Sequence, residues 1–110
     1  MSELNKPTKQ NAERILKEVD FDNRFIGGRL REKMGVTHET FYSFEEICNL
    51  LNDQMPFVNI DTLGRWVQDV MLDPELATKI SEVNRESDIY RDKIYRLRVL
   101  MAERLAQCKE

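Results

Sequence analysis

Apolar residues recur three or four positions apart along most of the chain, which is the spacing of an amphipathic helix. The first such segment follows Thr8, a residue type that caps helices well, and its apolar side chains are Ala12, Ile15, Leu16 and Val19. The second runs from Asp22 to Gly35, and its apolar side chains are Phe25, Ile26, Leu30 and Met34. Glycine often ends a helix in a left-handed conformation, so we expect this second helix to stop at Gly35.

Two further helices have clear starting signals. The hydroxyl of Ser43 and the carboxylate of Glu46 can each accept a hydrogen bond from the other residue's backbone N–H, a capping box that predicts a helix from residue 44. Asn59 or Asp61 can cap the next helix. The apolar stripe of that helix consists of Ile60, Leu63, Trp66, Val67, Val70 and Met71.

The final segment predicts one long helix over residues 74–109. Asp73 and Pro74 are typical of a helix start, and the segment after Pro74 contains neither Gly nor Pro. A heptad-like stripe, interrupted by Ser87 and Arg104, consists of Leu76, Ile80, Val83, Tyr90, Ile94, Leu97, Met101 and Cys108. A straight helix of this length would span about 54 Å. A compact domain of this size is only about 30–35 Å across, so the helix either breaks near residues 84–87 or packs on another chain.

The predicted fold is therefore all-α. A disordered tail at residues 1–7 precedes a single helical domain over residues 8–110, with a compact head of three or four short helices (8–72) and a long amphipathic helix (74–109) with a coiled-coil-like seam. We favour packing on another chain over a break. The residues expected to bind that partner lie in the part of the seam that the head would leave uncovered: Tyr90, Ile94, Leu97 and Met101.

Composition agrees with a soluble domain of ordinary size. The chain has 110 residues, of which 41% are hydrophobic and 34% charged, and its net charge is -3. That length fits one domain, and the apolar fraction is sufficient for a core. Two cysteines are too few for a disulfide scaffold, and we see no membrane span or signal peptide. We expect a cytoplasmic protein.

Residues that could carry catalysis are scarce. His38 is the single histidine, so no zinc-protease motif can be completed, and Cys48 and Cys108 lie 60 positions apart. There is no phosphate-binding glycine loop and no nucleophile elbow. We therefore expect no enzymatic activity, no cofactor, no metal and no small-molecule substrate.

Residues 43–51 followed by residues 60–67 resemble a helix-turn-helix motif. In the second of these helices, Thr62, Arg65 and Gln68 would be exposed as in a recognition helix. Arg24 and Arg31, seven positions apart on the predicted second helix, would share a face and could also contact DNA. The connection over residues 54–59 is longer than the usual turn of the motif, and both halves of the chain are slightly acidic.

The sequence thus predicts a non-catalytic protein-interaction module. It would be a small regulatory, adaptor or accessory subunit that binds a protein partner or itself, as a homodimer or within a larger complex, through its C-terminal helix. The alternative is a dimeric helix-turn-helix transcriptional regulator that binds DNA.

Overall fold

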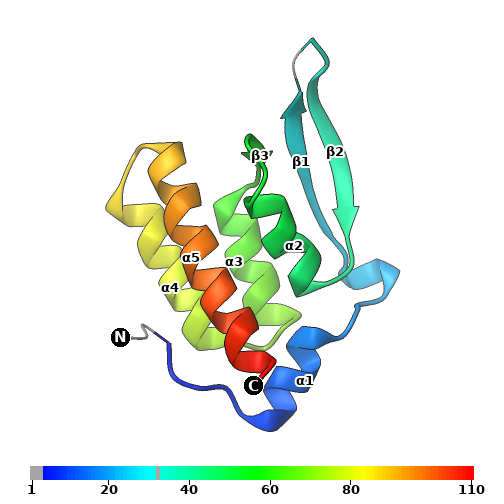
Figure 1. The fold of residues 1–110 in the computed structure, drawn as a ribbon, viewed down its shortest axis with the longest axis vertical. Coiled ribbons are helices and arrows are strands. Elements are labelled where there is room, and N and C mark those ends of the chain that lie inside the picture. Colours follow the sequence, from blue (N-terminus) through cyan, green and yellow to red (C-terminus); the bar gives the residue numbers. More distant parts are fainter. Residues whose placement is uncertain (1–3, 32) are drawn as a thin grey trace.

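The computed structural model describes residues 4–31 and 33–110, and within them it contains five α-helices and one three-stranded antiparallel sheet (Figure 1). The elements follow in the order α1 (Lys9–Leu16), a 3₁₀ turn η1 (Phe21–Asn23), β1 (Phe25–Arg31), β2 (Gly35–Phe41), α2 (Phe44–Leu51), β3 (Pro56–Phe57), α3 (Ile60–Asp69), α4 (Pro74–Glu86) and α5 (Tyr90–Cys108). The protein is a mixed α/β protein, and the all-α prediction is wrong.

The helices form the body of the molecule and α5 lies at its centre. This helix packs against α1, α2 and α4, while α3 packs against α4. Side chains with no solvent exposure come from all five helices and include Ile15, Leu50, Leu51, Leu63, Ile80, Leu97 and Met101. The buried side chains form one cluster, which joins elements from both halves of the chain.

The segment predicted as the second helix forms the first strand and the turn of a β-hairpin, which projects away from the helices (Figure 1). Its helix-like spacing misled because only one of the four apolar residues enters the core. Phe25 is buried, whereas Ile26, Leu30 and Met34 are 54%, 44% and 72% exposed. Gly35 does adopt a left-handed conformation, with φ of 71°, but it serves the turn between β1 and β2 rather than a helix end.

The sheet has the strand order β2-β1-β3. Phe25 pairs with Phe41 at the base of the hairpin, and Arg31 pairs with Gly35 near its tip. Gly28 lies at the centre of the hairpin, where a Cβ atom would approach the carbonyl oxygen of Thr37 to 2.8 Å. The lack of a side chain at residue 28 therefore permits the strands to pair closely.

Four of the predicted helix caps are confirmed, but only one half of the capping box is present, because the Glu46 carboxylate accepts from the Ser43 hydroxyl (3.4 Å) in place of the Ser43 N–H. Thr8, Ser43, Asn59 and Asp73 each accept a hydrogen bond from the backbone N–H three residues on. Asn59, and not Asp61, caps α3. Pro74 occupies the first turn of α4, where the missing N–H has no intrahelical partner to lose.

The prediction of one long helix over residues 74–109 is wrong, and with it the coiled-coil seam. The helix ends at Glu86, Ser87 is extended, and the Ser87 hydroxyl accepts a hydrogen bond from the N–H of Ile89 (3.0 Å). α5 then returns alongside α4 (Figure 1). The apolar stripe folds back on itself, so its two halves are covered within one chain.

A buried arginine fastens the open end of this helical hairpin. Arg104, 2% exposed, places Nε 2.8 Å from Oδ2 of Asp73 and donates from Nη2 to Glu75 (2.9 Å). Its Nη1 donates to the carbonyl oxygen of Asn5 (2.7 Å). Part of the segment predicted to be a disordered tail, residues 1–3, lies outside the described residues, while Leu4 is buried.

Candidate functional site

An apolar groove of about 760 Å³ lies between the sheet and the first half of α5. Leu30 of β1, Val36 of β2 and Phe57 of β3 form its sheet wall. The opposite wall comes from α5, where residues 90, 91, 94, 95 and 98 share one helix face. Residues 54–56 complete the groove. It therefore depends on three segments that are distant in sequence.

The groove leaves large apolar side chains in contact with water. Tyr95, Met55, Phe57 and Leu30 are 64%, 51%, 50% and 44% exposed. Single exposed apolar residues are ordinary, but a contiguous apolar surface usually marks a binding site. Ile94 is buried and lies at the inner side of the same helix face.

The α5 wall is fixed to the loop before α3 by Tyr90. Its hydroxyl accepts a hydrogen bond from the N–H of Val58 (2.9 Å) and donates to the carbonyl oxygen of Pro56 (3.0 Å). Burial raises the pKa of Tyr90, so the phenol stays protonated and can make both bonds. Tyr90 thus lines the groove with a partly exposed side chain, while its hydroxyl is held by hydrogen bonds.

The sheet wall is held by Arg29, on the face of the hairpin opposite Leu30. Its guanidinium contacts Glu39 of β2 (2.5 Å) and Asp53, which follows α2 (3.3 Å). Since Asp53 belongs to the helical body, this pair of contacts joins the hairpin to the body. Both carboxylates are paired with this one cation, which does not line the groove.

The charges that line the groove are all positive among the described residues. Arg91 and Arg98 lie on the groove face of α5, and no described acidic side chain joins them. Arg98 is held by a hydrogen bond from Nε to the carbonyl oxygen of Leu51 (2.8 Å). Arg91 is exposed and has no ion pair with a described residue. A chain of net charge -3 therefore presents a cationic apolar groove.

The structure places the four predicted partner-binding residues in two environments. Ile94, Leu97 and Met101 are buried, at 4%, 0% and 0% exposure. The head and α4 cover them, so the reason for expecting a partner there does not apply. Tyr90 is 42% exposed, and both Tyr90 and the buried Ile94 line the groove. The groove residues that the sequence did not single out as partner contacts are Leu30, Val36, Gln54, Met55, Pro56, Phe57, Arg91, Tyr95 and Arg98.

The structure brings three of the five predicted DNA contacts together on α3 and places the other two elsewhere. Thr62, Arg65 and Gln68 are exposed on α3, but the connection from α2 to α3 includes β3. Arg24 lies before β1 with its guanidinium 3.8 Å from the centre of the Phe21 ring, whereas Arg31 ends β1. The expectation that Arg24 and Arg31 share a helix face is wrong, because the strand places them at opposite ends.

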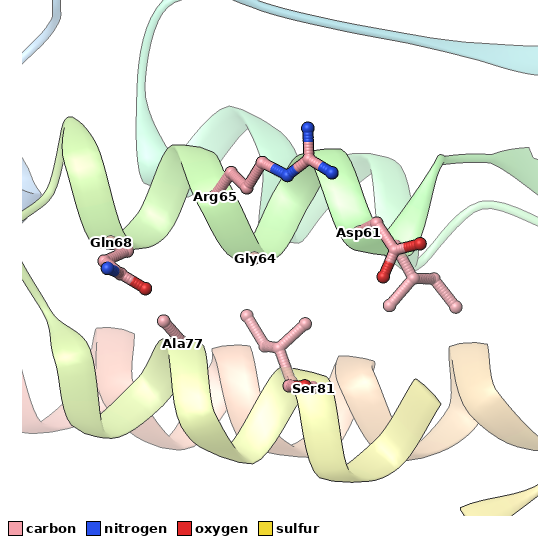
Figure 2. A pocket seen from close by; sticks show the side chains of 8 residues that line it. Asp61, Gly64, Arg65, Gln68, Ala77 and Ser81 are labelled. Atoms are coloured by element: carbon pink, nitrogen blue, oxygen red, sulfur yellow. The ribbon is translucent and has the colours of Figure 1, made fainter. Parts of the chain in front are cut away.

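A second, smaller pocket of about 210 Å³ lies between α3 and α4 (Figure 2). Figure 2 shows Gln68 and Asp61 near its two ends, with Gly64 between them and Ala77 and Ser81 on the facing helix. Asp61 already accepts a hydrogen bond from the Asn84 amide (2.9 Å). The pocket is smaller than most ligand sites, so we regard the groove as the candidate site.

Titratable groups do not gather into a further site. Cys48 and Cys108 are buried as free thiols, and burial raises the pKa of Cys48 to about 12. Within the described ranges, no three His, Cys, Asp or Glu side chains are placed to hold a metal ion. No helix in the same ranges combines the length and the apolar character needed to cross a bilayer.

Comparison of the chain with known protein families, with curated proteins and with solved structures gave no match.

Proposed function

We propose that this chain is a non-catalytic protein-interaction module that binds an acidic, amphipathic helix of a partner protein in the groove between the sheet and α5. The observation that carries the proposal is the combination of exposed Phe57, Met55 and Tyr95 with Arg91 and Arg98 on one surface. The α5 side of this surface includes Tyr90 and Ile94, two of the four residues that the sequence predicts to bind a partner. Aromatic and arginine side chains are enriched among the residues that dominate binding at such surfaces.

A protein fits the groove better than a small molecule does. The volume of about 760 Å³ is within the range of ligand pockets, but Ile26 of β1 and Val99 of α5 are further exposed apolar side chains on the two elements that form the groove walls. Burying an exposed apolar side chain of this size stabilises a complex by about 1.5–3 kcal/mol. A protein partner that also covers Ile26 and Val99 buries more apolar surface than a small molecule inside the groove, so it gains more of this free energy.

A helix fits better than an extended strand. The edge of β1 that faces the groove is already paired with β3, and the N–H of Leu30 donates to the carbonyl oxygen of Met55 (2.9 Å). The groove therefore offers side chains and little free backbone for strand addition. A helix satisfies its own backbone hydrogen bonds and binds apolar grooves through side chains alone.

The charge of the groove favours acidic partners. Arg91 and Arg98 are seven positions apart on α5, so their Cα atoms are separated by about 10.5 Å along the helix axis. Two carboxylates two turns apart on a bound helix match that separation. The same two arginines are too few for strong phosphate binding, so we favour an acidic protein segment over DNA.

The test uses designed helical peptides labelled with a fluorophore. One peptide carries apolar residues at helical spacing and Glu two turns apart, and a matched peptide carries Lys at those Glu positions. We expect fluorescence anisotropy to show binding of the Glu peptide only. Arg91→Glu and Tyr95→Asp should each weaken binding by about tenfold or more.

Matched controls separate the groove from the rest of the surface. Leu16→Asp changes an exposed apolar residue on α1 and should leave binding unchanged. Arg65→Glu changes an exposed α3 arginine, and it should also leave peptide binding unchanged. Equal binding of the Glu and Lys peptides, or no effect of Tyr95→Asp, would contradict the proposal. Binding of duplex DNA that Arg65→Glu abolishes would favour the helix-turn-helix alternative instead.

A cytoplasmic location belongs to the same proposal. It is supported by the two free, buried thiols, since reduced cysteines are typical of reducing compartments.

A further inference from the structure

The outer edge of β2 is unpaired within the described part of the chain. The sheet order β2-β1-β3 makes β2 an edge strand, and it is seven residues long. The N–H of Leu30 donates to Met55, on the β3 side of β1, so Leu30 makes no backbone hydrogen bonds with its partner Val36 on β2. Because hydrogen-bonded pairs alternate along an antiparallel ladder, the backbone groups of Val36, His38 and Thr40 all point away from β1. These three residues present their N–H and C=O groups to solvent.

This edge lacks the usual devices that prevent strand addition. The strand sequence GVTHETF contains no Pro, Lys or Arg, and it pairs with β1 in unbroken register without a bulge. Its one charged residue, Glu39, turns its carboxylate onto Arg29 of the neighbouring strand. The edge is therefore open to another strand.

We infer that β2 pairs with β2 of a second copy of this chain, around a two-fold axis at His38. Antiparallel pairing of a strand with itself is isologous, so Val36 of each copy faces Thr40 of the other. The three outward residues of each copy then form about six backbone hydrogen bonds. The two sheets join into one, and the apolar faces carrying Ile26 and Leu30 become continuous.

Charge complementarity favours a second copy as the occupant. The N–H of Val19 donates to the carbonyl oxygen of Tyr42 (2.7 Å), which places the start of η1 beside the outer edge at the base of the hairpin (Figure 1). The two-fold pairing lays the hairpin tip of one copy against this segment of the other. The tip carries Arg31 and Lys33, and the η1 segment carries Asp20 and Asp22.

These charges are available for that contact. Arg31, Lys33 and Asp22 are exposed and form no ion pair with a described residue. Each dimer repeats the contact twice by symmetry. The surface lies on the sheet edge opposite to β3, so the inference does not depend on the groove or on what the groove binds.

Sedimentation equilibrium from about 1 to about 500 µM tests the pairing, because a single strand pair buries a small area and gives a weak dimer. We expect reversible dimers of the wild-type chain. His38→Pro removes an outward N–H, a change that an edge strand tolerates, and should weaken association by at least about tenfold. Its thermal unfolding should confirm that it stays folded. Tyr95→Asp, in the groove, should leave association unchanged.

Charge reversal identifies the copy-to-copy contact. Lys33→Glu and Asp22→Lys should each weaken the dimer by about two- to fivefold, and the double variant should recover wild-type association. Hydrogen exchange should show protection of the amides of Val36, His38 and Thr40 that rises with protein concentration. A monomer at the highest concentration, or a dimer in which those amides stay unprotected, would overturn the inference.

Discussion

Arg104 Nε lies 2.8 Å from Asp73 Oδ2, and this ion pair joins the last turns of α5 to the cap of α4. Both side chains are almost fully buried, at 2% and 6% exposure. Their burial explains how an arginine can occupy a position in an apolar stripe: its charge is matched within the core by Asp73 and by Glu75.

Replacing that arginine should strongly destabilise the fold. Arg104→Met keeps much of the side-chain volume but leaves Asp73 buried without its cation. We expect the free energy of unfolding to fall by about 3–5 kcal/mol, measured by urea denaturation. Arg65→Met, at an exposed position of α3, is the matched control and should change it by less than about 0.5 kcal/mol. Similar losses in both variants would contradict this account.

Stability should decline in acid through Glu75. Partial burial opposes ionisation of this carboxyl, but the N–H of Asn5 and the Arg104 guanidinium outweigh it and hold the pKa below its usual 4.5. The ionised form therefore stabilises the fold above that pH, and the contribution disappears as pH falls through the lowered pKa. When the urea midpoint is measured on either side of pH 4.5, it should fall less steeply with decreasing pH for Glu75→Gln than for the wild type. Parallel curves would show that Glu75 does not contribute.

Two glycine substitutions should act in opposite directions. Gly28→Ala would place a Cβ 2.8 Å from a backbone oxygen of β2, so it should destabilise the hairpin by about 1–3 kcal/mol. Gly64→Ala would place its Cβ 3.6 Å from Ile80, an ordinary contact, within α3. It should stabilise the protein by about 0.5–1 kcal/mol because alanine favours helices. Thermal unfolding checks both, and destabilisation by Gly64→Ala would refute the packing described for α3 and α4.

The Tyr90 hydroxyl should contribute to stability as well as to groove shape. Tyr90→Phe keeps the ring but leaves the N–H of Val58 without its acceptor, and we expect a loss of about 1 kcal/mol. Tyr95→Phe removes a hydroxyl from a ring that is 64% exposed and should have little effect. Urea denaturation of the pair separates the two roles, and equal stability of all three proteins would count against the hydrogen bonds at Tyr90.

Local signals in the sequence predicted local structure correctly. Caps such as Ser43 and Asp73 bond to a backbone N–H only three residues away, so their geometry is set before tertiary contacts form. The predicted core positions of α2 and α3, such as Leu50 and Leu63, are also buried as expected. Their helices are short, and the stripe faces the interior over their whole length.

Non-local structure could not be predicted in the same way. The sequence does not predict the hairpin because Ile26, Leu30 and Met34, each four positions apart, mimic helical spacing, whereas strand pairing with residues 35–41 is what fixes the segment. The break after α4 has only Ser87 as a signal, since no Gly or Pro marks it. The groove joins residues 30, 57 and 95, and a single sequence contains nothing that brings these positions together.

The contacts of Arg104 and Gln107 with the backbone of Asn5 and Leu4 give the chain a nearly circular path. The Lys6 Nζ and Glu110 Oε2 atoms form an ion pair of 3.6 Å. The C-terminus lies on the side of the molecule away from the hairpin (Figure 1). A short linker could therefore connect residues 4–6 with the end of α5, and new termini could be opened elsewhere without stretching the fold. A domain fused to the end of α5 would project from this side and leave both the groove and the edge of β2 accessible.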